Sequence, residues 1–132
     1  MSDHSKLREL AKKSASFAHA PYSGALVGAA IETDDGTFYG GCNVENSSFG
    51  GTTCAEQVAI FKAVSEGKKR IKRVYVYTSA GWPPCGICRQ IISEFAGPEL
   101  EVIIGDHSGK ESVTSLKDLL PLAFTPDEYN KK

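Results

Sequence analysis

Four cysteines are the residues of this 132-residue chain whose type and spacing most directly suggest chemistry. Three of them stand where a loop is expected to lead into a helix: Cys54 at one place, and the C-x-x-C pair Cys85 and Cys88 at another. The free N–H groups and the dipole of a helix N-terminus stabilise a thiolate, which is the form of cysteine that binds metals. Two such helix starts that face each other would hold a metal ion between them.

The number of thiols in the group decides what kind of metal site it would be. A C-x-x-C pair alone fits a redox pair or half of a structural zinc site. A structural zinc normally takes four protein ligands, whereas three thiolates leave one position open for water, which is the catalytic arrangement. We interpret the fourth cysteine, Cys42, as a buried free thiol outside the metal site. If Cys42 bound the metal, the site would be closed and the catalytic interpretation would fail.

Glu56 stands two positions after Cys54, where a carboxylate can take a proton from a water molecule on the metal. The stretch Thr53-Cys54-Ala55-Glu56 also matches a capping box, in which Thr53 caps the helix and Glu56 bonds back to the backbone. The sequence Pro84-Cys85-Gly86-Ile87-Cys88 follows downstream. C-x-E followed by P-C-x-x-C is the pattern of zinc deaminases, and the combination favours a catalytic Glu56.

The elements that position these residues follow from hydrophobic spacing and turn signals. We expect helices over residues 5–19, 54–66, 85–95 and 115–120, and strands over residues 26–33, 37–43, 73–78 and 101–105. The first two strands flank Asp34-Asp35-Gly36, which predicts an antiparallel hairpin. Residues 44–53 are rich in Asn, Ser, Gly and Thr and should form a loop. The second half alternates strand and helix, which predicts an α/β fold with a mixed sheet covered by helices on both faces.

Composition sets the outer limits on function. Hydrophobic residues make up 41% and charged residues 23% of the chain, with a net charge of −1. These values predict one folded domain over residues 1–132, without the basic excess that non-specific nucleic-acid binding favours. The apolar stretches are too short for a membrane span, and the N-terminus has no apolar signal region. We therefore expect a cytoplasmic protein that does not bind membranes.

Several spaced motifs in one order resemble a known family. They are Pro21-Tyr22-Ser23, Val27-Gly28-Ala29-Ala30, Gly41-Cys42-Asn43-Val44-Glu45-Asn46, Thr53-Cys54-Ala55-Glu56, Pro84-Cys85-Gly86 with Cys88-Arg89-Gln90, and Leu119-Leu120-Pro121 with Phe124. Between about residue 21 and residue 124 the chain resembles the small, three-cysteine, homotetrameric cytidine deaminases. The resemblance implies a three-layer α/β/α sandwich with a mixed five-stranded sheet. It also implies hydrolytic deamination of cytidine and 2′-deoxycytidine to uridine and 2′-deoxyuridine in pyrimidine salvage, with ammonia released.

The resemblance also implies roles for individual residues. Cys54, Cys85 and Cys88 would bind one Zn²⁺ per subunit, and Glu56 would carry the proton of the attacking water to the ring nitrogen and then to the departing amine. Asn43 and Glu45 would bind ribose hydroxyls, while backbone groups of Ala55 and Cys85 would hold the base. Phe124 would close over a nucleoside in a neighbouring subunit. Without the resemblance, Asn43 and Glu45 fit solvated turn residues, and Phe124 fits ordinary core packing.

Two residues depart from the family pattern. Members commonly carry Arg after the catalytic Glu, whereas this chain has Gln57. Three thiolates on Zn²⁺ leave a charge of −1, and Gln57 can donate N–H bonds to sulfur without supplying positive charge. We expect a working site that depends more on its helix N-termini. Ala25 stands where relatives usually place a Phe against the pyrimidine, which predicts a raised KM for cytidine or tolerance of bulkier cytosine derivatives.

The sequence is also compatible with other functions. Residues 68–73, with the sequence KKRIKR, could bind phosphates and favour a deaminase that acts on cytosine in single-stranded nucleic acid. Basic residues are equally typical of the solvated end of a helix. A deaminase of the blasticidin-S type is less favoured, because Asn43-Val44-Glu45-Asn46 is intact. A zinc-binding module without activity, or a redox protein, would release no ammonia from any nucleoside.

Overall fold

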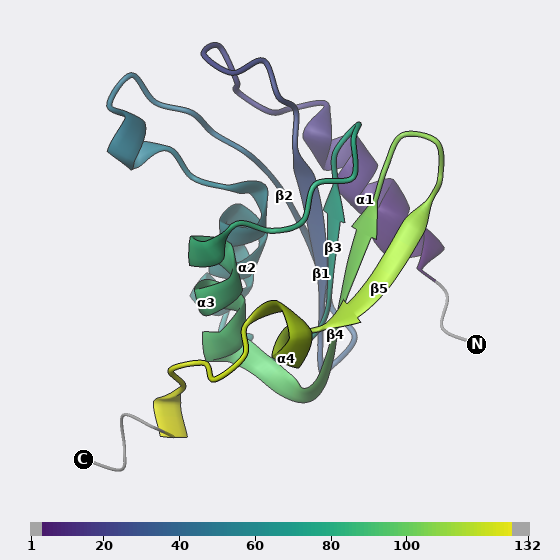
Figure 1. The fold of residues 1–132 in the computed structure, drawn as a ribbon, viewed down its shortest axis with the longest axis vertical. Coiled ribbons are helices and arrows are strands. Elements are labelled where there is room, and N and C mark those ends of the chain that lie inside the picture. Colours follow the sequence, from purple (N-terminus) through teal and green to yellow (C-terminus); the bar gives the residue numbers. More distant parts are fainter. Residues whose placement is uncertain (1–3, 128–132) are drawn as a thin grey trace.

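The strands form one five-stranded sheet in the order β2-β1-β3-β4-β5. This computed structural model describes residues 4–127 (Figure 1). Its elements are α1 (Ser5–Ala15), β1 (Gly28–Thr33), β2 (Phe38–Cys42), the 3-10 turn η1 (Phe49–Gly51), α2 (Ala55–Ser65), β3 (Ile71–Tyr77), α3 (Gly86–Phe95), β4 (Ala96–Gly105), β5 (Glu111–Ser115) and α4 (Leu116–Leu119). Strands β3 and β4 are parallel and the other neighbouring pairs are antiparallel, so the sheet is mixed.

Helices cover both faces of this sheet, with α1 on one face and α2 and α3 on the other (Figure 1). Successive strand residues point to opposite faces and so feed two separate cores. The core beneath α1 contains Leu7, Ala11, Ala30, Tyr75 and Ile103. The core beneath α2 and α3 contains Ile31, Ala59, Ile60, Val74, Val76, Ile92 and Val102. The predicted three-layer α/β/α sandwich is confirmed.

A close backbone contact fixes where α2 begins. A β-carbon on Gly41 in β2 would lie 2.5 Å from the carbonyl oxygen of Ala55 and 2.6 Å from the backbone nitrogen of Ala59. Any side chain at residue 41 would therefore push α2 away from the sheet. Because Cys54 directly precedes α2, this contact also holds Cys54 in place.

The structure corrects several expected boundaries. The hairpin of β1 and β2 is confirmed, with Gly28 paired to Cys42. Helix α1 ends at Ala15 rather than at residue 19, because His19 forms a bridge with Val44 instead. Strand β4 begins at Ala96, five residues earlier than expected. Hydrophobic spacing also missed β5, a largely exposed edge strand, although the family resemblance implied a fifth strand.

Three connecting segments gather at the end of the sheet where β3 ends (Figure 1). They are residues 16–27, residues 43–54 and residues 78–85. The first two are joined by backbone hydrogen bonds from the N–H of His19 to the carbonyl of Asn43 and from the N–H of Glu45 to the carbonyl of His19. Within residues 4–127, no helix has both the length and the apolar character that a membrane span requires.

Candidate active site

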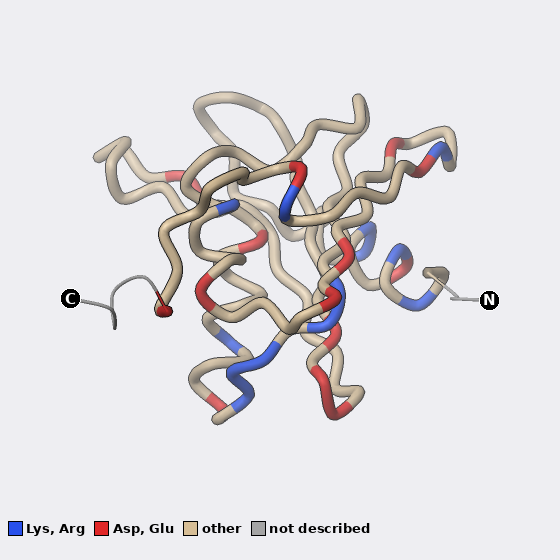
Figure 2. The backbone as a smooth tube through the Cα atoms, turned by 60° about the horizontal axis from the view of Figure 1, so that its bottom comes forward, with Lys and Arg blue, Asp and Glu red and all other residues tan. Residues whose placement is uncertain are grey.

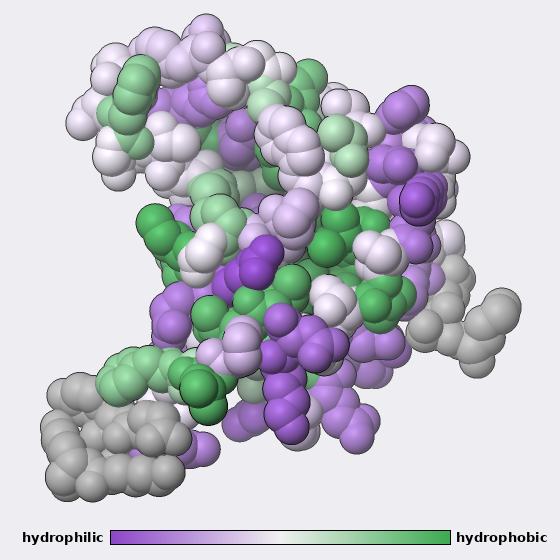
Figure 3. All heavy atoms as spheres, viewed as in Figure 1, coloured by the Kyte–Doolittle hydropathy of each residue, from purple (hydrophilic) through white to green (hydrophobic). Residues whose placement is uncertain are grey.

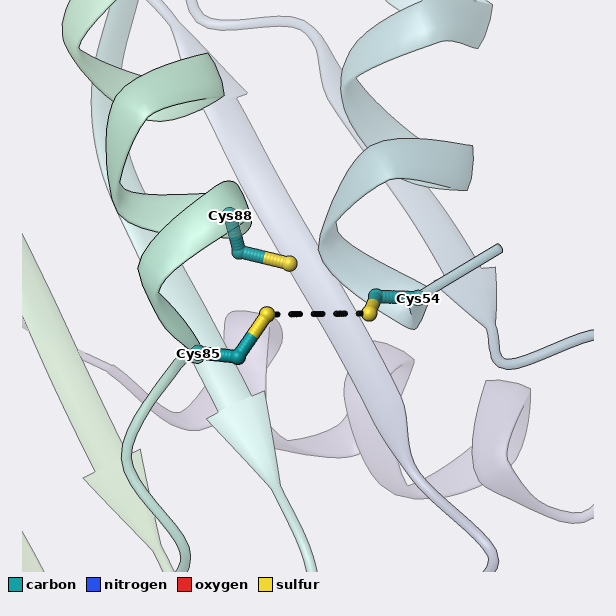
Figure 4. A group of neighbouring side chains, drawn as sticks. All are labelled: Cys54, Cys85 and Cys88. Atoms are coloured by element: carbon teal, nitrogen blue, oxygen red, sulfur yellow. Dashed lines mark hydrogen bonds between the residues drawn. The ribbon is translucent and has the colours of Figure 1, made fainter. Parts of the chain in front are cut away.

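Cys54, Cys85 and Cys88, here called the thiol cluster, come together between two helix starts (Figure 4). Cys54 is the residue directly before α2, Cys85 is the residue directly before α3, and Cys88 lies in the first turn of α3. The three sulfur atoms all lie within 4.8 Å of one another. Two helix N-termini therefore adjoin the same group of thiols, the arrangement that a metal site between them would need.

The spacing of the sulfur atoms fits a zinc ion. Zn–S bonds of about 2.3 Å in tetrahedral geometry place two sulfurs about 3.8 Å apart, and the sulfurs of Cys54 and Cys85 are 3.9 Å apart. Among the described residues, the metal-binding group contains these three cysteines and not Cys42. Cys42 lies at the end of β2 and is half-buried rather than buried as expected. The donor set therefore leaves a fourth position open.

The thiols differ in acidity because each perturbs its neighbours. The adjacent thiol of Cys88 lowers the pKa of Cys54 to about 7, while burial of Cys54 opposes this shift. The contact with Cys54, together with burial, raises the pKa of Cys88. Gln57 donates its side-chain N–H to the sulfur of Cys88 over 3.6 Å. The prediction that Gln57 donates to a thiol is confirmed.

Glu56 is buried beside the thiol cluster, with 4% of its surface exposed. Burial raises the pKa of its carboxyl group, and hydrogen bonds from its own backbone N–H and from the Cys88 thiol oppose the rise. The capping-box interpretation is wrong: Cys54 rather than Thr53 stands at the cap position of α2, and no side-chain cap bond is present there. Within residues 4–127, Glu56 has no ion-pair partner and is available as a base.

A cavity of about 320 Å³ opens from the thiol cluster to the surface. The predicted residues that line it are Ala25, Asn43, Glu45, Cys54, Ala55, Glu56 and Cys85. The prediction of the site from sequence did not include Ser23, Thr78 and Trp82, which also line it. Ser23 belongs to the Pro21-Tyr22-Ser23 motif, and Trp82 precedes the Pro-Pro-Cys stretch, so both had a usable signal in the sequence.

Asn43 and Glu45 line the cavity and at the same time hold one of its walls. The Asn43 side chain accepts a hydrogen bond from the N–H of Val27 at 3.0 Å and donates one to the carbonyl of Ala25 at 2.8 Å. Glu45 accepts from the N–H groups of residues 22 and 23 and from the hydroxyl of Ser23. These bonds lower the pKa of Glu45. Neither residue is a freely solvated turn residue.

Phe124 lies apart from the cavity. Its side chain is exposed, at 61%, and its carbonyl oxygen accepts a hydrogen bond from the side chain of Gln90 at 2.8 Å. The core-packing alternative is therefore wrong for this residue. The ring does not line the cavity of its own chain.

The basic run, residues 68–73, lies at the end of β3 away from the cavity (Figure 2), and three of its five basic side chains form ion pairs with other described residues. Lys68 pairs with Asp35, Lys72 with Glu32, and Arg73 with both Glu32 and Glu101. A phosphate backbone would have to compete with these carboxylates. The geometry gives no support to a single-stranded nucleic acid running from the basic run to the cavity.

Comparison with known proteins gives one consistent family. The family described as "Cytidine and deoxycytidylate deaminase zinc-binding region" matches residues 1–104. A cytidine deaminase from Sporosarcina psychrophila is 42% identical over 130 residues, which cover 97% of this chain and 96% of that protein. The crystal structure of cytidine deaminase from Burkholderia pseudomallei superposes with a TM-score of 0.88 and is 42% identical, covering 93% of this chain and all of that chain.

The blasticidin-S alternative finds a weaker match. A blasticidin-S deaminase from Bacillus cereus is 35% identical over 109 residues, which cover 75% of this chain and 76% of that protein. Both its identity and its coverage are lower than those of the cytidine deaminases just described. The comparison therefore does not favour the blasticidin-S alternative.

Proposed function

Because the chain belongs to the cytidine and deoxycytidylate deaminase family and is a zinc hydrolase of that family, we propose that it hydrolyses the 4-amino group of cytidine and 2′-deoxycytidine. The reaction consumes water and yields uridine or 2′-deoxyuridine and ammonia, a step of pyrimidine salvage. One observation carries the proposal. Three thiols with an open fourth position stand beside a buried, unpaired Glu56 at the base of a nucleoside-sized cavity.

We propose that Glu56 moves the proton during the reaction. Zinc, when bound by the thiol cluster, supplies a position at which a water molecule becomes acidic enough to react near neutral pH. The carboxylate of Glu56 would accept one proton of the attacking water and pass it to the ring nitrogen. It would then move the second proton of that water, from the new 4-hydroxyl group, to the amine, which leaves as ammonia while the C4 carbonyl forms. The raised pKa of Glu56 supports this role, because a carboxyl group that ionises closer to neutral pH can both accept and return a proton.

We further propose that Asn43 and Glu45 bind the sugar. Each retains hydrogen-bonding capacity: Asn43 has a second N–H, and the carboxylate of Glu45 has further lone pairs. Their bonds to residues 22–27 keep both side chains in a fixed direction. The backbone groups of Ala55, which is fully buried, and of Cys85 would hold the base beside Glu56.

The surface supports an assembly of several copies. Hydrophobic side chains reach the surface in several places (Figure 3). Phe49, Ile87 and Phe124 are 72%, 69% and 61% exposed. We propose a homotetramer in which Phe124 of one subunit closes the cavity of a neighbour. Residues 1–132 would form one domain of each subunit. A cytoplasmic location fits, because thiols that bind metal must remain reduced.

An absorbance assay of the purified, zinc-loaded protein tests the proposal. We expect saturable conversion of cytidine and 2′-deoxycytidine, with ammonia released in equal amount. Blasticidin S, single-stranded DNA and single-stranded RNA serve as competing substrates in parallel reactions. Turnover of one of these in place of the two nucleosides would overturn the substrate assignment, and no ammonia from any of them would overturn the proposed enzyme activity.

A further inference from the structure

Trp82 is the only aromatic residue among the described residues that line the cavity. It is also the single tryptophan of the chain. Although it lines the cavity, 54% of its surface is exposed. A large aromatic surface beside a cavity is costly to leave in water and is well suited to stacking on a planar ligand. Neither the thiol cluster nor Glu56 requires an indole at this position.

The backbone around Trp82 is held firmly, so its exposure does not come from a loose loop. The N–H of Trp82 donates to the hydroxyl of the buried Thr78 at 2.7 Å. Gly81 adopts a left-handed conformation with φ of 74° and makes the turn that this bond requires. His107, in the connection between β4 and β5, approaches the carbonyl oxygen of Ser79 with both its backbone N–H and its ring Nδ1, at 3.3 and 2.7 Å.

Two prolines set the position of Trp82 relative to the thiol cluster. Pro83 and Pro84 separate Trp82 from Cys85, and the proline ring fixes the backbone angle φ at each. Three residue steps span at most about 11 Å between Cα atoms, and Trp82 and Cys85 line the same cavity. A pyrimidine whose reacting carbon lies beside Cys85 and Glu56 would extend to within reach of the indole.

The cavity wall formed by residues 25 and 27 offers no aromatic surface, because it carries only the small side chains of Ala25 and Val27. We propose that Trp82 stacks on the pyrimidine ring and is a specificity-determining residue for the base. This inference rests on the proposed deamination of cytosine nucleosides. It assigns recognition of the base to an aromatic residue of the segment that leads into α3. The face of the pyrimidine away from Trp82 would then lie toward the small side chains of Ala25 and Val27, which leave room for substituents on the base.

Fluorescence of the single tryptophan tests the contact directly. Uridine, the expected product, is titrated into the zinc-loaded protein without turnover, and ribose is titrated as the control for sugar binding alone. We expect saturable quenching of Trp82 by uridine and none by ribose. Uridine that inhibits cytidine turnover yet leaves the fluorescence unchanged would overturn the stacking contact.

Kinetics of substitutions at Trp82 provide the second test. Trp82→Ala should raise KM for cytidine about three- to tenfold with a smaller effect on kcat, and Trp82→Phe should restore most of the loss. Phe17→Ala is the matched control, because Phe17 is also a largely exposed aromatic residue, at 70%, but does not line the cavity. Circular dichroism and zinc content show whether each variant folds and binds metal.

The outcomes separate this inference from the proposed function. If the wild-type protein deaminates neither cytidine nor 2′-deoxycytidine, the proposed function fails. If the wild type is active and Trp82→Ala keeps the wild-type KM, only the stacking proposal fails. A Trp82→Ala protein that changes its molecular mass in solution but keeps its KM would show that the indole contacts another subunit rather than the base, which also overturns the proposal.

Discussion

At one end of strand β3 basic side chains pair with carboxylates, whereas at the other end acidic groups lie together without ion-pair partners among the described residues. The basic run overlaps its N-terminal end, and beyond its C-terminal end lie Thr78 and Trp82 of the cavity. Along the strand, the end of the run at Arg73 and the cavity residue Thr78 are about 16 Å apart. At the basic run, Lys68, Lys72 and Arg73 are paired with carboxylates.

At the cavity end, acidic groups lie together without basic side chains of the described residues as ion-pair partners. Three thiols and Glu56 lie together, and within residues 4–127 none of the ion pairs involves them. Gln57 donates a hydrogen bond to Cys88 but carries no charge. A zinc ion bound at the cavity end would supply the positive charge that this group lacks, whereas the ion pairs at the other end stabilise the fold. Substitutions at the two ends should therefore affect different measurements.

Glu56→Ala should give the largest effect. We expect kcat to fall at least about 10²- to 10⁴-fold, because no other carboxylate of the cavity lies beside the thiol cluster to move the proton. Zinc content, measured by mass spectrometry of the metal, should stay at one ion per chain. Glu66→Gln is the matched control, since Glu66 lies just after the same helix and accepts a hydrogen bond from Tyr39 instead. Wild-type turnover in Glu56→Ala would refute its assignment as the base.

Arg73→Met should affect stability and not catalysis. The guanidinium bonds to Glu32 at 2.7 Å and to Glu101 at 2.9 Å, and its loss leaves two partly buried carboxylates without this partner. We expect the free energy of unfolding to fall by about 1 to 2 kcal/mol, measured by urea denaturation. Lys69→Gln, at an exposed position of the same run, should change it by less than about 0.5 kcal/mol. A large fall in kcat with unchanged stability would contradict the division between the two ends.

Ala25→Phe tests whether the small side chain at residue 25 leaves space beside the base. A ring at residue 25 would restore an aromatic contact worth about 0.5 to 1.5 kcal/mol, so KM for cytidine should fall about two- to tenfold. The same ring would fill space, and 5-substituted and N4-substituted cytidines should become poorer substrates. Steady-state kinetics with each nucleoside measures both effects. If the wild type already rejects the substituted cytidines, the room attributed to Ala25 is not used.

Gln57→Arg should give the smallest effect, by placing a positive charge beside the thiols. A cation lowers the pKa of nearby acids because it favours their charged forms. The acidic limb of the pH dependence of kcat/KM should therefore move to lower pH, by about one unit or less. Gln57→Lys is a useful companion, since it adds charge with different geometry. Superimposable acidic limbs for wild type and Gln57→Arg would show that charge at this position is unimportant.

The reacting groups could be predicted from the sequence because their spacing along the chain alone identifies them. Cys54 and Glu56, with the pair Cys85 and Cys88, fall at helix starts whatever the details of the loops. The contacts of Asn43 and Glu45 could not be predicted, because they depend on how residues 16–27 fold back over residues 43–54. Trp82 was missed for the same reason: only the folded loop shows which side of the chain faces the cavity.

In the fold, too, some elements follow from the local sequence, whereas others depend on contacts with distant parts of the chain. The hairpin of β1 and β2 follows from the turn at Asp34-Asp35-Gly36, and its strands are antiparallel as expected. Strand β5, with the sequence ESVTS, has one large apolar residue and is largely exposed, so no hydrophobic pattern marks it. It is a strand because it pairs with β4 at the edge of the sheet. The early start of β4 was hidden by Gly97 and Pro98, which are typical of a turn.

Zinc-edge X-ray absorption of the purified protein tests the central claim most directly. The claim is that the thiol cluster holds one catalytic zinc and leaves its fourth position to a non-protein ligand. We expect one zinc per chain with three sulfur neighbours at about 2.3 Å and one lighter neighbour, unchanged in a Cys42→Ser variant. Four sulfur neighbours, reduced to three in Cys42→Ser, would show a closed structural site and contradict the account.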